Sequence, residues 1–251
     1  MRYFWLPKNL DVEITDSTGS MLRLTHYPLC PHSRSIRIAL GELRLDFELN
    51  YEEPWAWRQS FLSLNPSGAL PVLEIDDVLV LCGTYAVSEY LAECYPEHPD
   101  DGGTVPLFPG DPEQRAEVRR LVDWFHLKFD REVTRELLIE KHYRRTVGEK
   151  GKPPDSQILR AVSKNLRYHM DYICFQVDRS NWLAGDELSF ADLAAAAHIS
   201  VLDYLGEITW EDYPSATEWY VRLKSRPSFQ PVLDDYMAIQ PPTSHYANLD
   251  F

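Results

Sequence analysis

Residues 22–33, Leu-Arg-Leu-Thr-His-Tyr-Pro-Leu-Cys-Pro-His-Ser, decide the fold of this 251-residue chain. Leu22 and Leu24 alternate with polar neighbours, which indicates a β-strand. After Pro31 the apolar residues recur at helical spacing instead. The segment therefore predicts a strand that ends near a thiol, Cys30, and a helix that begins directly after it.

The residues that follow complete a small α/β unit. Its remaining elements are predicted to be a strand, a helix, two strands and a helix, at residues 47–51, 57–64, 72–75, 78–81 and 84–94. Asp76 and Asp77 separate the two short strands and are typical of a hairpin turn. The order is βαβ, then a helix, then ββα, which is the thioredoxin arrangement. We assign this thioredoxin-like domain to residues 21–99.

The rest of the chain divides into three further parts. Residues 100–112 are rich in Pro, Gly and Asp and are predicted to be a linker. An all-helical domain is expected over residues 113–236, and residues 237–251 form a C-terminal tail. Residues 1–20 are interpreted as a leader or an added arm, without an assigned function.

Capping residues mark where the helices of the second domain begin. Asp111-Pro112-Glu113-Gln114 combines a cap, a proline at the first helical position and a capping-box glutamine. Asp155 and the segment Ser189–Asp192 provide similar starts, and Pro214 and Pro227 are expected to begin two short helices. The residues after Asp192 are apolar almost all round, so that helix is predicted to lie at the centre of a bundle.

The charge of the chain excludes several classes of partner. Its 25 Lys and Arg against 39 Asp and Glu give a net charge of −14, without a basic block that would suit nucleic acid or an anionic lipid surface. We therefore expect no nucleic-acid partner. The chain also lacks an apolar run long enough for a bilayer, so direct membrane insertion is not expected.

Cysteines and histidines indicate neither a disulfide framework nor a metal site. The four cysteines are few and scattered, which suits a reducing cytosol: Cys30, Cys82, Cys94 and Cys174. Four histidines fall on predicted helices without a second ligand three or four residues away: His126, His142, His169 and His198. From this spacing no metal site is expected.

In its motifs and their order the chain resembles the glutathione transferase superfamily. The motifs are Cys30-Pro31 at the start of the first helix, the segment Leu70-Pro71-Val72-Leu73 before a hairpin, and the Ser-x-x-Asp box at Ser189. The resemblance implies an N-terminal thioredoxin-like domain, an all-helical C-terminal domain and a homodimer. It also implies that Pro71 is a cis-proline, which lets the backbone of Leu70 pair with glutathione.

Two roles for Cys30 remain open. The start of a helix favours a thiolate, because unpaired N–H groups and the helix dipole stabilise negative charge. Cys30 is then a nucleophile that forms mixed disulfides with glutathione, and Ser33 fits a one-thiol redox spacing. Alternatively, Cys30 is a small side chain that packs well in a core.

Gly83-Thr84 departs from the pattern of the superfamily. There, an acidic residue followed by Ser holds the γ-glutamyl end of glutathione, whereas this chain has Gly83 at the acidic position. Such a charge-assisted bond contributes roughly 1.5–3 kcal/mol, so its loss weakens binding by about one to two orders of magnitude. Glutathione is therefore not expected to be required, unless an acidic side chain of a partner subunit replaces the missing one.

The C-terminal segment narrows the resemblance to the FtsZ-binding, transferase-like division proteins of alphaproteobacteria. It reads Pro241-Pro242-Thr243-Ser244-His245-Tyr246-Ala247-Asn248-Leu249-Asp250-Phe251. We expect this tail either to dock on the helical domain or to take part in partner binding. The residues interpreted as partner-binding are Trp55, as an exposed aromatic anchor, and Tyr246, Leu249, Asp250 and Phe251. The nearby Trp57 is expected to be covered.

The resemblance implies a non-catalytic protein that binds FtsZ filaments and supports cell division and constriction. It would be cytoplasmic and recruited to the division site. The main alternative is an omega-like, Cys30-dependent glutathione transferase or thiol reductase. A transcription partner of the stringent-starvation type shares the fold, although the tail does not favour it.

Overall fold

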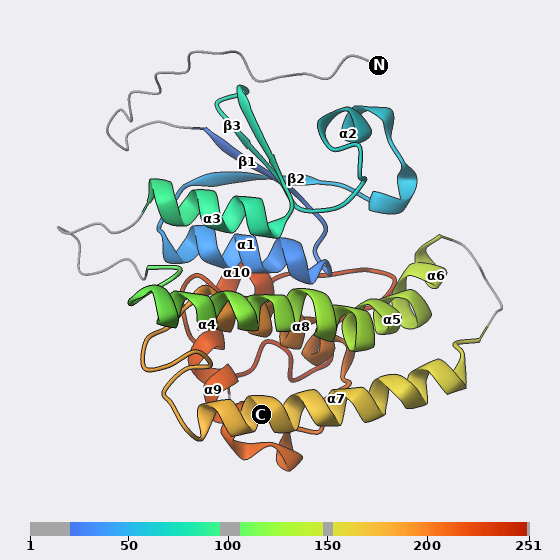
Figure 1. Ribbon diagram of the computed structural model, residues 1–251. Helices are drawn as coiled ribbons and strands as arrows, with labels where there is room; N and C mark the ends of the chain where they lie inside the picture. Colours follow the sequence, from blue (N-terminus) through green and yellow to red (C-terminus); the bar gives the residue numbers. More distant parts are fainter. Residues whose placement is uncertain (1–20, 96–105, 148–152, 250–251) are drawn as a thin grey trace.

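The computed structural model describes residues 21–95, 106–147 and 153–249 (Figure 1). The leader expected at residues 1–20 and the part of the expected linker before residue 106 lie outside these ranges. Among the described helices, none is both long and apolar enough to cross a bilayer. The described chain confirms the expected α/β domain followed by an all-helical domain.

The sheet of the first domain has four strands in the order β2-β1-β3-β4. Their bounds are β1 Leu22–His26, β2 Phe47–Tyr51, β3 Val72–Ile75 and β4 Leu79–Cys82. β1 runs parallel to β2 and antiparallel to β3, and β3 runs antiparallel to β4. Asp76 and Asp77 take φ values of 53° and 55° between β3 and β4. This left-handed conformation is one that Asp tolerates. The turn connects the antiparallel strands β3 and β4, so the predicted hairpin is confirmed.

Within its described residues the first domain has three α-helices and one 3-10 turn, and two of these helices separate its sheet from the second domain. Their bounds are α1 Pro31–Glu42, the 3-10 turn η1 Pro54–Ala56, α2 Gln59–Leu64 and α3 Thr84–Cys94. α1 and α3 lie between the sheet and the helical domain (Figure 1). α2 begins two residues later than predicted, because Trp57 follows η1 in a left-handed conformation that a helix cannot continue through.

A continuous helix opens the second domain. Its segments are α4 Pro112–Asp123, η2 Trp124–Thr134, α5 Arg135–Leu138, η3 Ile139–Tyr143 and α6 Arg144–Thr146, of which η2 and η3 are π-helical. The carboxylate of Asp111 accepts hydrogen bonds from the backbone N–H groups of Glu113 and Gln114, each at 2.9 Å, which confirms the predicted cap. Phe125 and Phe129 are fully buried, as their helical spacing predicted.

The other elements of the second domain surround α8. They are α7 Ser156–Val177, α8 Phe190–Leu205, η4 Trp210–Asp212, α9 Pro214–Lys224 and α10 Gln230–Leu233. α8 is buried from its first residue to Tyr204, so its predicted central place is confirmed. The last helix begins at Gln230 and not at Pro227, because a turn in which the Phe229 N–H donates to the Arg226 carbonyl comes first.

The two domains are joined through α1. The guanidinium of Arg34 is completely buried and donates to the Ser200 hydroxyl on α8 at 2.8 Å and to the Asp235 carboxylate at 3.2 Å. Arg37, one turn further along α1, donates to the same carboxylate at 2.8 Å. α1 therefore belongs to the core of both domains.

Candidate functional site

Cys30 lies where the predicted strand–thiol–helix segment places it, between β1 and α1. Its backbone N–H donates to the Tyr27 carbonyl at 2.9 Å, and Pro31 is the first helical residue. The Cys30 side chain is half-buried and packs against the core. The thiol is therefore at the start of a helix but only partly in contact with solvent.

The environment of Cys30 does not favour a thiolate. Burial raises the pKa of its thiol, and the nearby Asp130 carboxylate of the second domain acts in the same direction. Hydrogen bonding to Ser33 and to the backbone of His32 acts in the opposite direction but is the smaller effect. Of the two roles left open for Cys30, this environment favours the packed thiol over the thiolate, because desolvation outweighs the helix terminus.

Pro71 precedes β3 and has the conformation that the resemblance implied. The Leu70–Pro71 peptide bond is cis. Leu70 and Pro71 are both buried, and the Gly83 N–H donates to the Pro71 carbonyl at 3.0 Å. This hydrogen bond holds the cis-proline segment beside the residues that precede α3.

Gly83 and Thr84 form the other wall of the glutathione-type site. Gly83 takes a φ of 87°, which favours glycine, and a Cβ built on it would meet no other described atom within 4 Å. The Thr84 hydroxyl lies 3.5 Å from Nδ1 of His32 on α1. The site therefore has open space at the acidic position and a hydroxyl that is turned toward a histidine.

The two tryptophans near β2 differ from the expectation, because Trp55 is the more buried of the two and Trp57 is the exposed one. Trp55 is half-buried, and its ring centroid lies 4.9 Å from that of Tyr27 and 5.1 Å from that of Tyr143 in the second domain. Trp57, expected to be covered, is 64% exposed. The reason is the backbone at Trp57, which follows η1 in a left-handed conformation. The indole of Trp55 therefore reaches Tyr27 and Tyr143, whereas that of Trp57 does not.

The tail docks on the helical domain along most of its described length. The Thr243 hydroxyl donates to the Asp203 carbonyl at 3.0 Å, and the Asn248 carbonyl accepts from the buried ammonium of Lys224 at 2.7 Å. Tyr246 is completely buried, and its hydroxyl donates to the Val232 carbonyl at 3.0 Å. The docking alternative is thus confirmed for this part of the tail.

Burial changes which tail residues can meet a partner. The direct partner-binding role expected of Tyr246 is wrong, because its ring lies against Tyr204 with the centroids 5.1 Å apart and the side chain has no exposed surface. Leu249 is 39% exposed and remains accessible. Asp250 and Phe251 lie outside the described residues.

Comparison with known proteins identifies the family. Residues 24–99 match the N-terminal domain of glutathione S-transferases, and residues 137–227 match their C-terminal domain. The chain belongs to the glutathione S-transferase family.

Its similarity is high to a transferase-like relative that is named after FtsZ. The chain is 44% identical to FtsZ-localized protein A of Caulobacter vibrioides, over 91% of this chain and 97% of that protein. The solved structure of FzlA from C. crescentus has a TM-score of 0.86 at 43% identity, covering 92% of this chain and all of that one (100%). A glutathione S-transferase from Rhodospirillum rubrum has the same TM-score of 0.86 at 47% identity, with coverages of 92% and 100%.

A lower identity relates the chain to a transferase of Escherichia coli. The glutathione S-transferase GstB is 28% identical over 80% of this chain and 91% of that protein. The comparison places this member of the glutathione S-transferase family nearer in sequence to FtsZ-localized protein A than to GstB.

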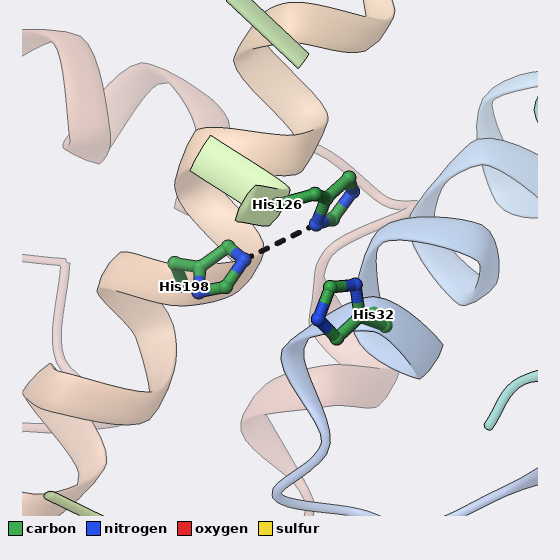
Figure 2. A group of neighbouring side chains, drawn as sticks. All are labelled: His32, His126 and His198. Atoms are coloured by element: carbon green, nitrogen blue, oxygen red, sulfur yellow. Dashed lines mark hydrogen bonds between the residues drawn. The ribbon is translucent and has the colours of Figure 1, made fainter. Parts of the chain in front are cut away.

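The structure also brings together three histidines that the sequence did not connect. His32 on α1, His126 on η2 and His198 on α8 each offer a ring nitrogen, and these atoms lie within 4.8 Å of one another (Figure 2). Nδ1 of His126 and Nε2 of His198 are 3.1 Å apart. Burial, and then the neighbouring histidines, lower the pKa of both His126 and His198 well below the usual range, so these imidazoles are uncharged.

Sequence spacing could not reveal this cluster, because its members come from three separate helices in two domains. The one local signal was His198, a buried polar side chain on a central helix that is mostly apolar. Such a residue needs a buried partner, although the sequence does not say which one.

Proposed function

We propose that this protein binds FtsZ filaments as a non-catalytic member of the glutathione S-transferase family and supports cell division and constriction. The observation that carries the proposal is the 44% identity to FtsZ-localized protein A, which extends over nearly the full length of both proteins. The protein is cytoplasmic in this proposal and is recruited to the division site.

The environment of the thiol supports a role without thiol chemistry. A thiol whose pKa is raised by burial is mostly protonated near neutral pH, and the thiolate is the nucleophilic form. Gly83 offers no carboxylate for the ammonium group of glutathione. Neither feature hinders binding to a protein filament, and no cofactor is required in this proposal.

Trp57 is the aromatic residue that we assign to the contact with FtsZ, in place of Trp55. Its side chain is 64% exposed, and exposed tryptophans contribute disproportionately to protein interfaces. The edge strand β2 next to it adds Leu49 and Tyr51, which are 46% and 44% exposed. Leu249 in the tail, together with Asp250 and Phe251, remains a proposed partner contact.

A homodimer is part of the proposal. Val78 before β4, Tyr85 on α3 and Leu127 on η2 are 72%, 66% and 65% exposed, and apolar side chains of this size are typical of subunit interfaces. Analytical ultracentrifugation should show a dimer, and the double substitution Tyr85→Glu with Leu127→Glu should give a monomer. A wild-type monomer at micromolar concentration would contradict the proposed dimer.

Co-sedimentation with FtsZ polymers tests the main proposal. The wild-type protein should pellet with polymerised FtsZ and remain in the supernatant without nucleotide. Trp57→Ala should weaken the association about tenfold or more, whereas Phe175→Ala, which removes an aromatic side chain 51% exposed on α7, should not. Cys30→Ser should bind like the wild type. Failure of the wild-type protein to pellet with FtsZ polymers would exclude the proposal.

A glutathione transferase or thiol reductase activity is the second candidate. It is supported by the cis-proline Pro71 and by Cys30 and Thr84, which stand at the positions that the resemblance implies for glutathione. Titration calorimetry with reduced glutathione distinguishes the candidates. The binding proposal predicts little heat, and saturable binding together with turnover that Cys30→Ser abolishes would support the enzyme.

A further inference from the structure

Three imidazoles converge where α1 of the first domain meets η2 and α8 of the second (Figure 2). Imidazole nitrogens are preferred ligands of zinc, and three of them with an open fourth position form a recognised coordination set. We propose that His32, His126 and His198 bind one zinc ion at this domain boundary. The proposal does not depend on FtsZ binding.

The hydrogen bonds around His126 fix which of its nitrogens is available. The Ser35 hydroxyl donates its single hydrogen to the His32 carbonyl at 2.8 Å, so its oxygen can only accept from Nε2 of His126, which lies 3.3 Å away. Nε2 of His126 therefore carries the proton, and the lone pair of Nδ1 accepts the hydrogen bond from Nε2 of His198 at 3.1 Å. That lone pair is directed at His198.

Nε2 of His198 faces the same point from the other side. It lies 3.1 Å from Nδ1 of His126, and two ligands of a tetrahedral zinc ion are separated by about 3.3 Å when each bond is 2.0–2.1 Å long. The hydrogen bond between the two rings therefore already has nearly the spacing of a ligand pair. To bind zinc, His198 has to move its proton from Nε2 to Nδ1, and the two rings have to turn slightly so that both lone pairs meet at the ion.

The hydroxyl oxygen of Thr134 can accept a hydrogen bond from Nδ1 of His198 once that nitrogen carries the proton. Its hydroxyl lies 2.9 Å from Nδ1 of His198. A hydroxyl donates to the imidazole in one tautomer and accepts from it in the other, by rotation of its hydrogen. Ser35 and Thr134 thus hold the outer nitrogens of His126 and His198, as hydrogen-bond partners commonly do for histidine ligands of metals.

His32 completes the set from the first domain. Its side chain is 26% exposed, so it is the member through which an ion can enter and the one with most room to move. A shift of roughly 1–2 Å brings its nitrogen from the observed separation to ligand spacing. The Asp130 carboxylate, 3.7 Å from Nε2 of His32, can orient this ring or occupy the fourth position in place of water.

The ligand set also indicates the class of metal. Uncharged imidazoles suit zinc, cobalt and nickel, whereas magnesium and calcium prefer oxygen ligands. Because His32 belongs to α1 and the other two histidines to the helical domain, a bound ion would connect the two domains directly.

Cobalt provides a spectroscopic test on the full chain without an affinity tag. After treatment with EDTA, the wild-type protein should bind one Co²⁺ per chain and show visible absorption of tetrahedral intensity, which Zn²⁺ then displaces. Zn²⁺ at a hundredfold excess over its Kd should raise Tm by roughly 5–10 °C. Weak absorption typical of six-coordinate cobalt, or no binding, would overturn the proposal.

Variants assign the binding to this cluster. His32→Gln and His126→Gln should each lower the Co²⁺ affinity about tenfold or more, whereas His245→Gln, at a half-exposed histidine in the tail, should leave it unchanged. His32 is only partly buried, so the His32→Gln test stands even where His126→Gln does not fold. Equal affinity in wild type and His32→Gln would show that the ion binds elsewhere.

Discussion

Two opposing effects act on the pKa of the Cys30 thiol, which lies at the start of a helix. The helix terminus stabilises a nearby negative charge by typically 0.3–1 kcal/mol, which corresponds to roughly 0.2–0.7 of a pKa unit. Burial destabilises the same charge and can shift a pKa by several units. At Cys30 burial is the larger effect, and the thiol pKa is raised from its ordinary value near 9.0.

The raised pKa of Cys30 predicts a contribution to stability that depends on pH. The native thiol holds its proton more tightly than the unfolded chain does, so the stabilisation is fully present below the ordinary thiol pKa and is lost as pH rises through the native one. Between pH 8 and 10.5 the wild type should therefore lose more unfolding free energy than Cys30→Ser. Urea unfolding across this range measures the difference, and parallel pH curves for the two proteins would contradict the prediction.

Replacing Gly83 by an acidic residue is expected to strengthen the binding of glutathione. Gly83→Glu adds a carboxylate where no other described atom lies within 4 Å of a Cβ, and should strengthen glutathione binding roughly 10- to 100-fold. The backbone conformation at Gly83 disfavours any side chain, at a cost to stability of about 1–3 kcal/mol.

Gly83→Ala is the matched control, because it carries the same backbone strain without the carboxylate. Titration calorimetry should detect tighter binding only in Gly83→Glu. If both variants bind glutathione equally, the missing acid is not what limits its affinity.

At the scale of the element, the start of α8 depends on Asp192. Its completely buried carboxylate accepts hydrogen bonds from the Leu183 N–H at 2.9 Å, from the Ser189 N–H at 3.1 Å and from the Trp219 indole at 3.0 Å. Asp192→Ala leaves these buried donors without their acceptor and should lower the unfolding free energy by about 3–5 kcal/mol.

Asp192→Asn retains an acceptor oxygen and should cost clearly less. Glu187→Ala, an exposed acidic residue shortly before α8, is the control and should change stability by less than about 0.5 kcal/mol. A small effect of Asp192→Ala in urea unfolding would mean that other groups or water replace the lost acceptor.

Periodicity and caps predicted most elements, but not how side chains from different elements meet. The long helix from Pro112 buries Phe125 and Phe129 as expected, because helical spacing fixes which residues share a face. Spacing did not predict that its middle part, η2, is π-helical. It also said nothing about which tryptophan near β2 would reach Tyr143, since that depends on one backbone conformation at Trp57.

The candidate site was predictable in position and only partly in chemistry. The cis-proline and the thiol at the helix start lie where the motifs indicated. The direction of the Cys30 pKa shift depends on burial and on Asp130, one hundred positions further along the numbering, and no local pattern contains that information. The histidine cluster is another property of the assembled domains.

For the whole molecule, Asp235 is one of the charged residues that join the two domains, beside the ion pairs of Glu42 with Arg226 and of Glu89 with Arg119. Its carboxylate accepts from Arg34 and Arg37, which are 0% and 5% exposed. Asp235→Ala leaves two guanidinium groups at the domain boundary without this counter-ion and should lower the unfolding free energy by about 3–5 kcal/mol.

Asp234→Ala provides a neighbouring control, because Asp234 is exposed. Calorimetry should show one cooperative transition in the wild type and either a lower Tm or two separate transitions in Asp235→Ala. An unchanged Tm would indicate that apolar packing between α1 and α8 is sufficient to join the domains.

The contact between Lys224 and the tail has a consequence for the order of events during synthesis. Lys224 and Asn248 are separated by 24 positions, which a ribosome covers in roughly 1–5 s. During that interval the nascent chain contains α9 but not the carbonyl that accepts from its buried ammonium. We therefore expect the helical domain to reach its full stability late in translation, so that prematurely terminated chains remain open to proteolysis while finished ones do not.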